Sequence, residues 1–265
     1  MKNKIFFFHI AKTAGSSFSQ FLAKHYWGEA HCERYLAGAE LVYLDYLAQL
    51  DYISGHIRLS TFVESGLVRE NYFLLTFLRE PIAQLLSNLN WVMHIYDISP
   101  SFFGNHPQFV QAMSLELRSL NLYEPDALIY ALEKFQNWFK NNQSRYFSVS
   151  QDVCAEKVIE TMSQLDMIGL TEHYEQSLRQ FADARNLRMT SSALKRVNQN
   201  LNYRVSKDIL DNPLIHEFLL DYNQVDIAVY SYFYPKIVQS FPPYSMADPN
   251  HLPRLLQQPD KIFSS

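Results

Sequence analysis

Short apolar runs alternate with amphipathic segments along most of the chain. Four runs are apolar almost throughout, which is typical of strands buried on both faces of a parallel sheet: residues 4–10, 52–56, 72–78 and 167–170. Apolar residues recur at helical spacing in several longer segments, at about residues 41–50, 124–140, 152–164, 172–186 and 214–233. Buried strands alternating with amphipathic helices predict an α/β protein with a central parallel sheet.

Two more helices are predicted directly after the first and third strands. The first has an apolar stripe formed by Phe18, Phe21, Leu22 and Tyr26. The second starts at Pro81, and its buried face is formed by Ile82, Leu85, Leu86, Leu89 and Met93. Residues 97–109 contain two prolines and a glycine, so they are predicted to form a loop. No clear linker is evident, so residues 1–265 are predicted to form a single domain, with residues 236–265 as a peripheral C-terminal tail.

Composition and charge narrow the class of protein. Of the 265 residues, 48% are hydrophobic and 19% are charged, which favours a packed core over disorder. The formal net charge of −4 argues against a nucleic-acid partner, although it leaves room for a local anion pocket. The two cysteines match no metal or redox spacing. No run approaches the roughly 20 apolar residues of a membrane span, and no signal peptide is evident, so we expect a cytoplasmic protein.

The first predicted strand is followed by a segment of small residues, AKTAGSS, at residues 11–17. Ligands of parallel sheets bind beyond the carboxyl ends of the strands. Ala14 and Gly15 would let backbone N–H groups approach an anion closely, and the following helix N-terminus adds partial positive charge. Lys12 adds a full charge. Hydroxyl donors come from Thr13, Ser16 and Ser17. The alternative is an ordinary helix start, capped by one of the serines, with a solvated lysine.

This turn does not match the phosphate loop of ATP-binding proteins. That loop reads G-x-x-x-x-G-K-[ST], with the lysine late in the loop. Here Lys12 precedes Gly15, and no aspartate is evident at a strand end to hold magnesium. A metal-free, phosphate-like ligand therefore fits the turn better. A P-loop-type nucleotide kinase remains the alternative, and it predicts magnesium dependence and ATP binding.

The segment HIAKTAGSSF, residues 9–18, resembles the 5′-phosphosulfate loop of sulfotransferases. The likeness is to the branch related to heparan sulfate 2-O- and 6-O-sulfotransferases, whose loop typically reads H-I-P-K-T-G-G-T-S. This chain differs at three positions, where Ala11, Ala14 and Ser16 replace proline, glycine and threonine. All three replacements are small, so we expect the anion cradle to be kept.

A second segment, TFLREPIAQLLSNLNW at residues 76–91, resembles the 3′-phosphate motif of the same family. In that motif an arginine ends a strand and a serine follows in the next helix; here these are Arg79 and Ser87. Arg79 is suited to a bidentate contact with phosphate, and its alternative is a surface ion pair with Glu80 or another acid. Ser87 is expected about two turns into the helix, off its buried face.

Weaker resemblances follow in the order of the family, at residues 141–147, 168–178, 196–200 and 226–233. The third of these is similar to a late loop that closes over the nucleotide. Arg196 and Asn198, with Lys195, are expected to cover the 3′-phosphate there, and a solvated charge cluster is the alternative. The resemblance implies a P-loop-kinase-like fold, a three-layer α/β/α sandwich. It also implies 3′-phosphoadenosine 5′-phosphosulfate (PAPS) as donor and the 3′,5′-bisphosphate (PAP) as product, with no metal.

Sulfuryl transfer needs a stabilised leaving phosphate and a base for the acceptor proton. Lys12 is predicted to stabilise the phosphate. His56 is predicted to be the base, because it ends a predicted strand on the edge of the sheet that carries the donor turn. Residues 52–62 also resemble the segment with the catalytic histidine in the heparan sulfate 2-O enzymes. The alternatives are a histidine bonded to backbone, or a carboxylate base such as Glu80 or Glu172.

Other residues have less defined roles. His9 is expected to be structural, and Arg58 lies on the strand face of His56 if that strand continues, where it would bind an acidic acceptor or be solvated. Aromatic residues gather after the 3′-phosphate helix, and they predict either a lid or platform for the acceptor or a part of the core: Trp91, Tyr96, Phe102, Phe103 and Phe109.

The predicted function is sulfuryl transfer from PAPS to a hydroxyl group, less readily an amine, of a glycan, a lipid or a small metabolite. The negative net charge of the chain slightly favours a neutral acceptor. A non-catalytic module that binds PAP or PAPS is a further alternative, and the oligomeric state is left open.

Overall fold

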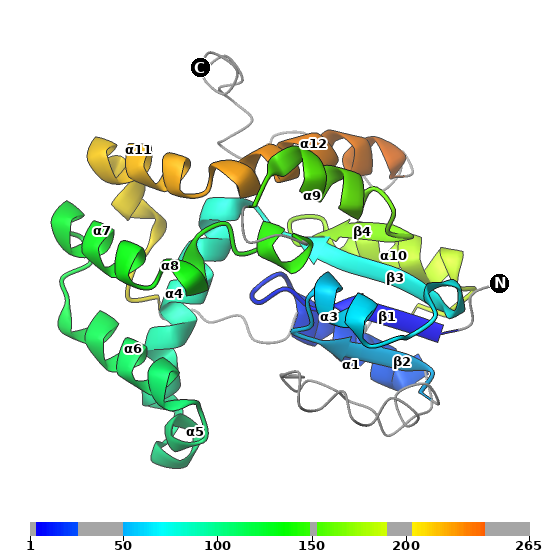
Figure 1. Cartoon of the computed structure of the whole chain (residues 1–265), viewed down its shortest axis with the longest axis horizontal. Helices are drawn as coiled ribbons and strands as arrows, with labels where there is room; N and C mark the ends of the chain where they lie inside the picture. The colour runs from blue at the N-terminus through cyan, green and yellow to red at the C-terminus, as the bar shows by residue number, and fades with distance from the viewer. Residues whose placement is uncertain (1–3, 26–49, 149–152, 190–202, 242–265) are drawn as a thin grey trace.

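The computed structural model describes residues 4–25, 50–148, 153–189 and 203–241 (Figure 1). Its centre is a sheet of four parallel strands in the order β2-β1-β3-β4. The strands are β1 (Lys4–Phe8), β2 (Tyr52–Gly55), β3 (Tyr72–Leu78) and β4 (Met167–Leu170). These ranges confirm the four predicted strands, although the first two end one or two residues earlier than expected.

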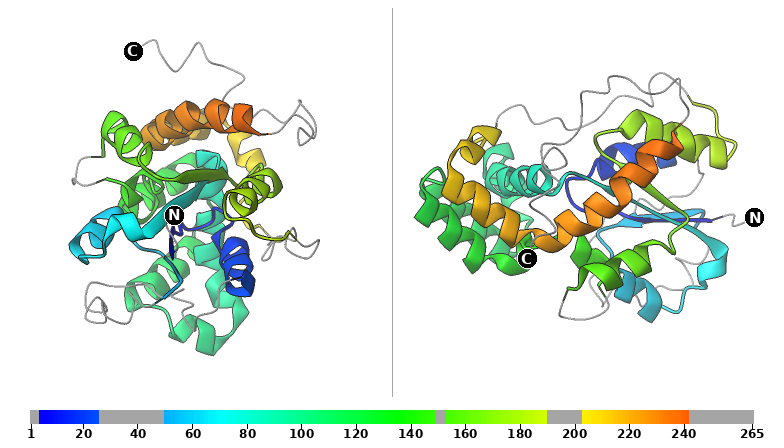
Figure 2. Two further views of the ribbon diagram at one scale, coloured as in Figure 1. Left: turned by 90° about the vertical axis from the view of Figure 1, so that its right-hand side faces the viewer. Right: turned by 90° about the horizontal axis from the view of Figure 1, so that it is seen from above.

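The sheet is buried on both faces, which explains why its strands are continuously apolar. In β1, Phe6 and Phe8 pack into one hydrophobic cluster, whereas Ile5 and Phe7 pack into another on the opposite face. The first face is covered by α3 (Leu59–Glu64), α9 (Ala155–Met162) and α12 (Gln224–Ser240). The second is covered by α1 (Gly15–His25) and α10 (Tyr174–Ala184) (Figure 2). The predicted three-layer α/β/α arrangement is therefore confirmed.

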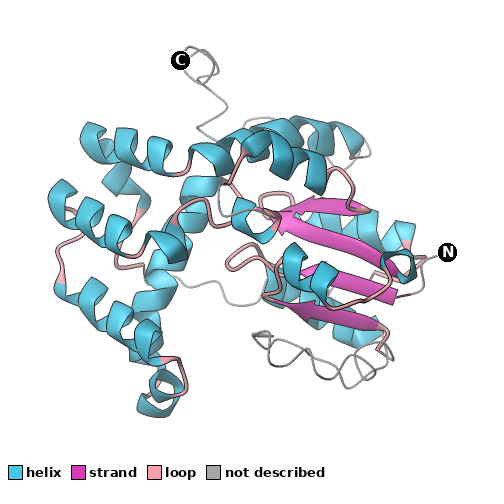
Figure 3. Cartoon of the chain, viewed as in Figure 1, coloured by secondary structure: helices cyan, strands magenta, loops and turns pink. Residues whose placement is uncertain are grey.

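A separate group of helices lies beyond the carboxyl ends of the strands (Figure 3). It is built on a hydrophobic cluster of its own, and we call it the helical lobe. Its members are α4 (Pro81–Ile98), α5 (Pro100–Gly104), α6 (Gln108–Ser119), α7 (Pro125–Lys134), α8 (Gln136–Phe139) and α11 (Pro213–Tyr222). Short 3₁₀ helices at Arg69–Asn71, Ser144–Tyr146 and Lys207–Asp211 complete the connections.

The prediction of a loop at residues 97–109 was wrong. The helix α4 continues to Ile98, α5 follows almost at once, and α6 begins at Gln108. The prolines mark helix starts here: Pro100 occupies the first turn of α5, and Pro107 directly precedes α6. The side chain of Ser99 also accepts a hydrogen bond from the Phe102 N–H and caps α5.

Three other predicted boundaries also changed. The helix predicted at 124–140 is divided at Phe135, and the one predicted at 214–233 is divided at Asn223. The helix α12 runs to Ser240, so the expected tail does not begin at residue 236. Residues 41–49 and 242–265 lie outside the described residues. None of the described helices is both long enough and apolar enough to cross a membrane.

Candidate active site

The turn after β1 has a backbone shaped for an anion. Lys12 and Ala14 both have a φ of 67°, in the left-handed region, and the right-handed helix α1 starts directly afterwards at Gly15. A left-handed residue followed by right-handed ones turns successive N–H groups toward one concavity, which is a common anion site. The N-terminus of an 11-residue helix adds further donors and a partial positive charge.

The hydroxyl residues of the turn are used differently from what the sequence suggested. The Thr13 hydroxyl is fully buried and donates to the Ile10 carbonyl oxygen at 2.9 Å, so it closes the turn internally. The helical hydrogen bonds begin at Ala14, whose carbonyl accepts from the N–H groups of Ser17 and Phe18. Ser16 and Ser17 therefore lie inside the first turn of α1 and do not precede it as caps.

Gly15 is required by close packing against His9. A Cβ atom at residue 15 would lie 1.8 Å from Cδ2 and 2.0 Å from Nε2 of the His9 ring. That ring is 6% exposed and stacks on Phe7 with 5.5 Å between ring centroids. Burial lowers the pKa of His9 well below its usual value, and His56 and Lys12 lower it further. The neutral ring of His9 thus forms the floor of the turn, in agreement with the expected structural role.

Lys12 carries the positive charge of the turn in a partly buried position. Its Nζ atom lies 4.8 Å from the ring centroid of Trp91 on α4. Burial, and to a lesser degree the Arg79 guanidinium, lower the pKa of Lys12 to about 8. The ammonium group is therefore still mostly protonated near neutral pH.

Arg79, at the end of β3, meets the same turn from the other side. Its guanidinium Nη1 donates to the Lys12 carbonyl oxygen at 3.0 Å. No ion pair of Arg79 is seen within the described ranges, because Glu80 instead caps α4 and accepts from the N–H groups at its start. The alternative of an Arg79–Glu80 ion pair is therefore not what the structure shows.

The Gln143 side chain fixes the backbone of Arg79. Its Oε1 accepts from the Arg79 N–H at 2.9 Å, and its Nε2 donates to the Arg79 carbonyl oxygen at 2.8 Å. The buried Asp226 in turn accepts from the N–H groups of Gln143 and Ser144 at 3.0 and 2.7 Å. Asn141 completes the link, because its Oδ1 accepts from the Val225 and Asp226 N–H groups at the start of α12.

Two glutamines hold the site together; Gln143 lies in the segment 141–147 whose resemblance to the family was noted above, whereas Gln84 was not singled out from the sequence. Besides Gln143, Gln84 on α4 donates from Nε2 to the Ala11 carbonyl oxygen at 2.8 Å and to Asn142 Oδ1 at 3.2 Å. The available signal was a polar residue in a helix that is otherwise apolar on its buried side. Ser87 is only 4% exposed on that helix, because α4 is packed inside the helical lobe and its residues 81–90 are all buried. It does not occupy an exposed face.

His56 follows β2, next to the floor of the turn. Its Nδ1 lies 2.7 Å from the His9 carbonyl oxygen and 3.3 Å from the Tyr146 hydroxyl. A carbonyl only accepts hydrogen bonds, so Nδ1 carries the proton and Nε2 bears the lone pair of the neutral ring. The two interpretations of His56 are therefore compatible: a backbone bond at one nitrogen selects the tautomer that a base requires.

The other candidates for acid–base or acceptor roles are placed less favourably. The strand β2 ends at Gly55, so Arg58 is not on a continued strand; it is exposed and precedes α3. Glu172 accepts from the Glu80 N–H at 2.9 Å and from the Tyr230 hydroxyl at 3.1 Å. Burial, with a smaller effect of Glu172, raises the pKa of Glu80. Lys195, Arg196 and Asn198 lie outside the described residues.

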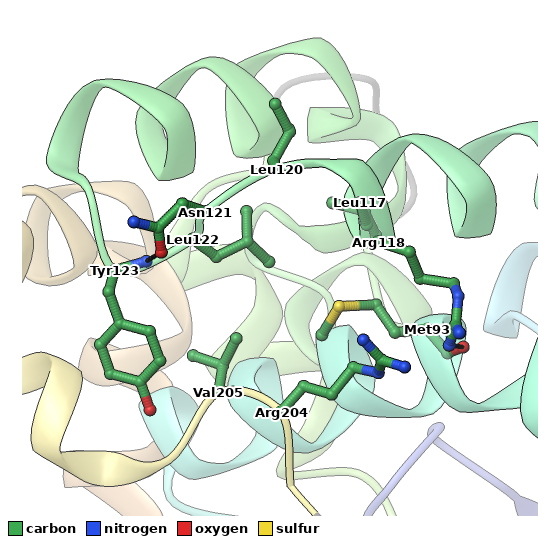
Figure 4. Close-up of a pocket in the computed structure, with 9 residues that line it drawn as sticks. All are labelled: Met93, Leu117, Arg118, Leu120, Asn121, Leu122, Tyr123, Arg204 and Val205. Atoms are coloured by element: carbon green, nitrogen blue, oxygen red, sulfur yellow. Dashed lines mark hydrogen bonds between the residues drawn. The ribbon is translucent and has the colours of Figure 1, made fainter.

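A small cavity of about 130 Å³ lies within the helical lobe (Figure 4). Its lining is formed by Met93, Leu117, Arg118, Leu120, Asn121, Leu122, Tyr123, Arg204 and Val205. Its two guanidinium groups both approach Asp97, at 2.8 Å for Arg118 and 3.6 Å for Arg204. None of the lining residues belongs to the turn or to a strand end, so this cavity is separate from the turn after β1.

Comparison with known proteins identifies the family of the chain. The model of the Sulfotransferase family matches residues 1–233. The chain belongs to this family. It is a sulfotransferase, which decides against the nucleotide kinase, and its central parallel sheet flanked by helices is consistent with the sulfotransferase fold. The comparison with curated proteins gave no match. The likeness to the heparan sulfate branch stays a prediction.

Replacing Ala14 by glycine is expected to stabilise the protein. Alanine at a φ of 67° is strained, whereas glycine adopts this region freely. Ala14→Gly should raise the free energy of unfolding by about 0.5–1 kcal/mol, measured by chemical denaturation. The matched control is Ala23→Gly at an exposed position of α1, which should lower it by about 1 kcal/mol. A lower free energy of unfolding in both variants would contradict the left-handed conformation of residue 14.

Replacing Gly15 by alanine is expected to disrupt the turn through overlap with His9. Gly15→Ala should lower the free energy of unfolding by about 1–3 kcal/mol or more. The same change in a His9→Ala background should cost much less, because the ring it collides with is gone. Gly104→Ala serves as the control, since a Cβ there meets no atom within 4 Å. Equal losses in the two backgrounds would show that His9 is not the obstacle.

Proposed function

We propose that this sulfotransferase takes its sulfuryl group from PAPS and transfers it to a hydroxyl group, less readily an amine, of a glycan, a lipid or a small metabolite. The observation that carries the proposal is the meeting of three strand ends. The Lys12 turn follows β1, Arg79 follows β3, and His56 follows β2, while β1 lies between the other two strands. Cationic, anion-binding and basic groups thus share one edge of the sheet.

The residues present fit a donor with two phosphate-type groups. The left-handed Lys12 and Ala14, with the start of α1, offer converging N–H groups, and the glycine at residue 15 lets the turn pack closely on the His9 ring. These groups would hold the 5′-phosphosulfate. Arg79, fixed by Gln143, would hold the 3′-phosphate, with Ser87 on the following helix. The bound donor supplies the sulfuryl group and leaves as PAP.

Lys12 and His56 supply the two catalytic functions of this proposal. Lys12 provides a positive charge beside the turn, where negative charge grows on the leaving phosphate oxygen. His56 accepts the proton of the acceptor hydroxyl at Nε2. Its Nδ1–H remains bonded to the His9 carbonyl oxygen, which orients the ring and stabilises its protonated form. The acceptor itself is left open by these residues.

The donor site is tested first by calorimetry with PAP, with ADP as competitor. We expect PAP to bind about micromolar or tighter, without magnesium, corresponding to at least about −8 kcal/mol. Arg79→Ala should weaken it by about 10- to 100-fold through loss of charged hydrogen bonds. The matched control is Arg179→Ala, which removes an exposed i,i+4 pair with Glu175 on α10 and should bind normally. Equal or tighter binding of ADP would overturn the donor assignment.

The role of His56 is tested by separating binding from turnover. His56→Ala should leave PAP affinity nearly unchanged but slow the release of PAP from PAPS, in the presence of an acceptor found by screening, by about 10²- to 10⁴-fold. His216→Ala on α11 is an exposed control that should have no effect. A base elsewhere is indicated if His56→Ala turns over at the normal rate. A protein that binds PAP but transfers to no acceptor would support the non-catalytic alternative.

A further inference from the structure

The ammonium group of Lys12 faces an aromatic ring and no carboxylate. Its Nζ lies 4.8 Å from the centroid of the Trp91 ring, within the usual distance for a cation–π interaction, and tryptophan is the strongest partner for it. Within the part of the chain that the structure describes, no acidic side chain comes within ion-pair distance of Lys12. The charge of Lys12 is therefore stabilised without being neutralised.

This choice of partner matters for a site that binds an anion. A carboxylate next to Lys12 would cancel its charge and repel a phosphate or sulfate group. The face of an indole ring attracts the ammonium by its quadrupole but carries no net charge. Lys12 thus keeps its full attraction for an anionic ligand, although it is partly buried and lies near the guanidinium of Arg79.

The ring of Trp91 is itself held in orientation by the helical lobe. Phe102 on α5 meets it edge to face at 6.1 Å between centroids, and His106 lies 4.9 Å from Phe102. Gln84, seven residues earlier on α4, donates to the Ala11 carbonyl oxygen of the turn. Residues seven apart share one helix face, so Gln84 and Trp91 point to the same side of α4. Gln84 contacts the backbone of the turn, and Trp91 contacts the Lys12 side chain of the turn.

We infer that Trp91 is a positioning residue, whose indole face holds the Lys12 ammonium in place beside the turn before an anionic ligand binds. The inference rests on the proposed function in one respect, namely that this ligand is a phosphate of the donor. A flexible lysine side chain loses considerable rotamer freedom when it is fixed. Contact with Trp91 restricts the Lys12 side chain already in the folded, ligand-free protein. Ligand binding then costs less side-chain entropy.

Two substitutions separate the aromatic contact from simple packing. Trp91→Phe keeps an aromatic face, whereas Trp91→Leu keeps an apolar side chain without one. The first readout is the titration of Lys12, followed by NMR after reductive methylation with ¹³C-formaldehyde and assigned with Lys12→Arg. Trp91→Leu should lower the pKa of Lys12, because the protonated form loses its partner while the site stays apolar. Trp91→Phe should stay close to the wild type.

The titration must be interpreted with the groups that surround Lys12. They are Arg79 at the end of β3, His9 after β1, and His94 on α4, whose ring lies 6.3 Å from that of Trp91. None of these groups changes in the two variants. The matched control is Tyr96→Leu, because Tyr96 lies on α4 like Trp91 and its ring also contacts a cation. That cation is the guanidinium of Arg118 on α6, at 4.5 Å from the ring centroid. It should leave the titration of Lys12 unchanged.

The second readout is the affinity for PAP near neutral pH. Trp91→Leu should weaken PAP by about 3- to 30-fold, while Trp91→Phe and Tyr96→Leu should bind nearly as the wild type does. An unchanged Lys12 titration in Trp91→Leu would overturn the inference. Equal losses in Trp91→Leu and Trp91→Phe would also overturn it, because they indicate packing alone. If the wild type bound no PAP, the donor assignment would fail, whereas the titration would still decide the role of Trp91.

Discussion

The organisation of the site depends on how His9 packs at the end of β1. The ring of His9 occupies the space of a Cβ at residue 15, so the turn can close over it only with glycine at that position. The carbonyl of the same residue accepts from Nδ1 of His56 and thereby selects its tautomer. One buried, neutral histidine thus fixes the turn after β1 through its side chain and the candidate base through its backbone.

A second constraint is the buried polar network behind Arg79. Asp226 is 2% exposed, and burial of its carboxylate raises its pKa, whereas the N–H groups of Gln143 and Ser144 act in the opposite direction. A buried acid is tolerated when such donors satisfy it. Here the network connects the end of β3 to the start of α12, although these segments are far apart in the chain. The backbone of Arg79 is therefore fixed by its two hydrogen bonds with Gln143, and its guanidinium is held separately by the bond to the Lys12 carbonyl oxygen.

The sequence predicted the parts of this architecture that depend on local pattern. Continuous apolar runs indicated doubly buried strands, and the small residues around Lys12 indicated a tight turn between the first strand and its helix. That this turn binds an anion stays a prediction. Contacts between distant residues were not predictable in this way, because the amide groups of Gln84 and Gln143 leave no periodic trace in the chain. The prolines near residues 100 and 107 were misinterpreted as loop markers, since a proline suits a helix start as well as a turn. The predicted exposure of Ser87 was wrong because the first part of α4, residues 81–90, is buried on all sides within the helical lobe.

The candidate site also lies across two hydrophobic cores. The turn between β1 and α1 belongs to the packing around the sheet, whereas α4, which carries Gln84 and Trp91, belongs to the core of the helical lobe. A bound donor that contacts both would therefore add a further link between these hydrophobic clusters, beside the contacts of Gln84 and Trp91 with the turn. Leu128 and Leu132 pack in the same core as α4. A substitution at either residue would then change the distance between α4 and the turn after β1, although neither residue belongs to the site.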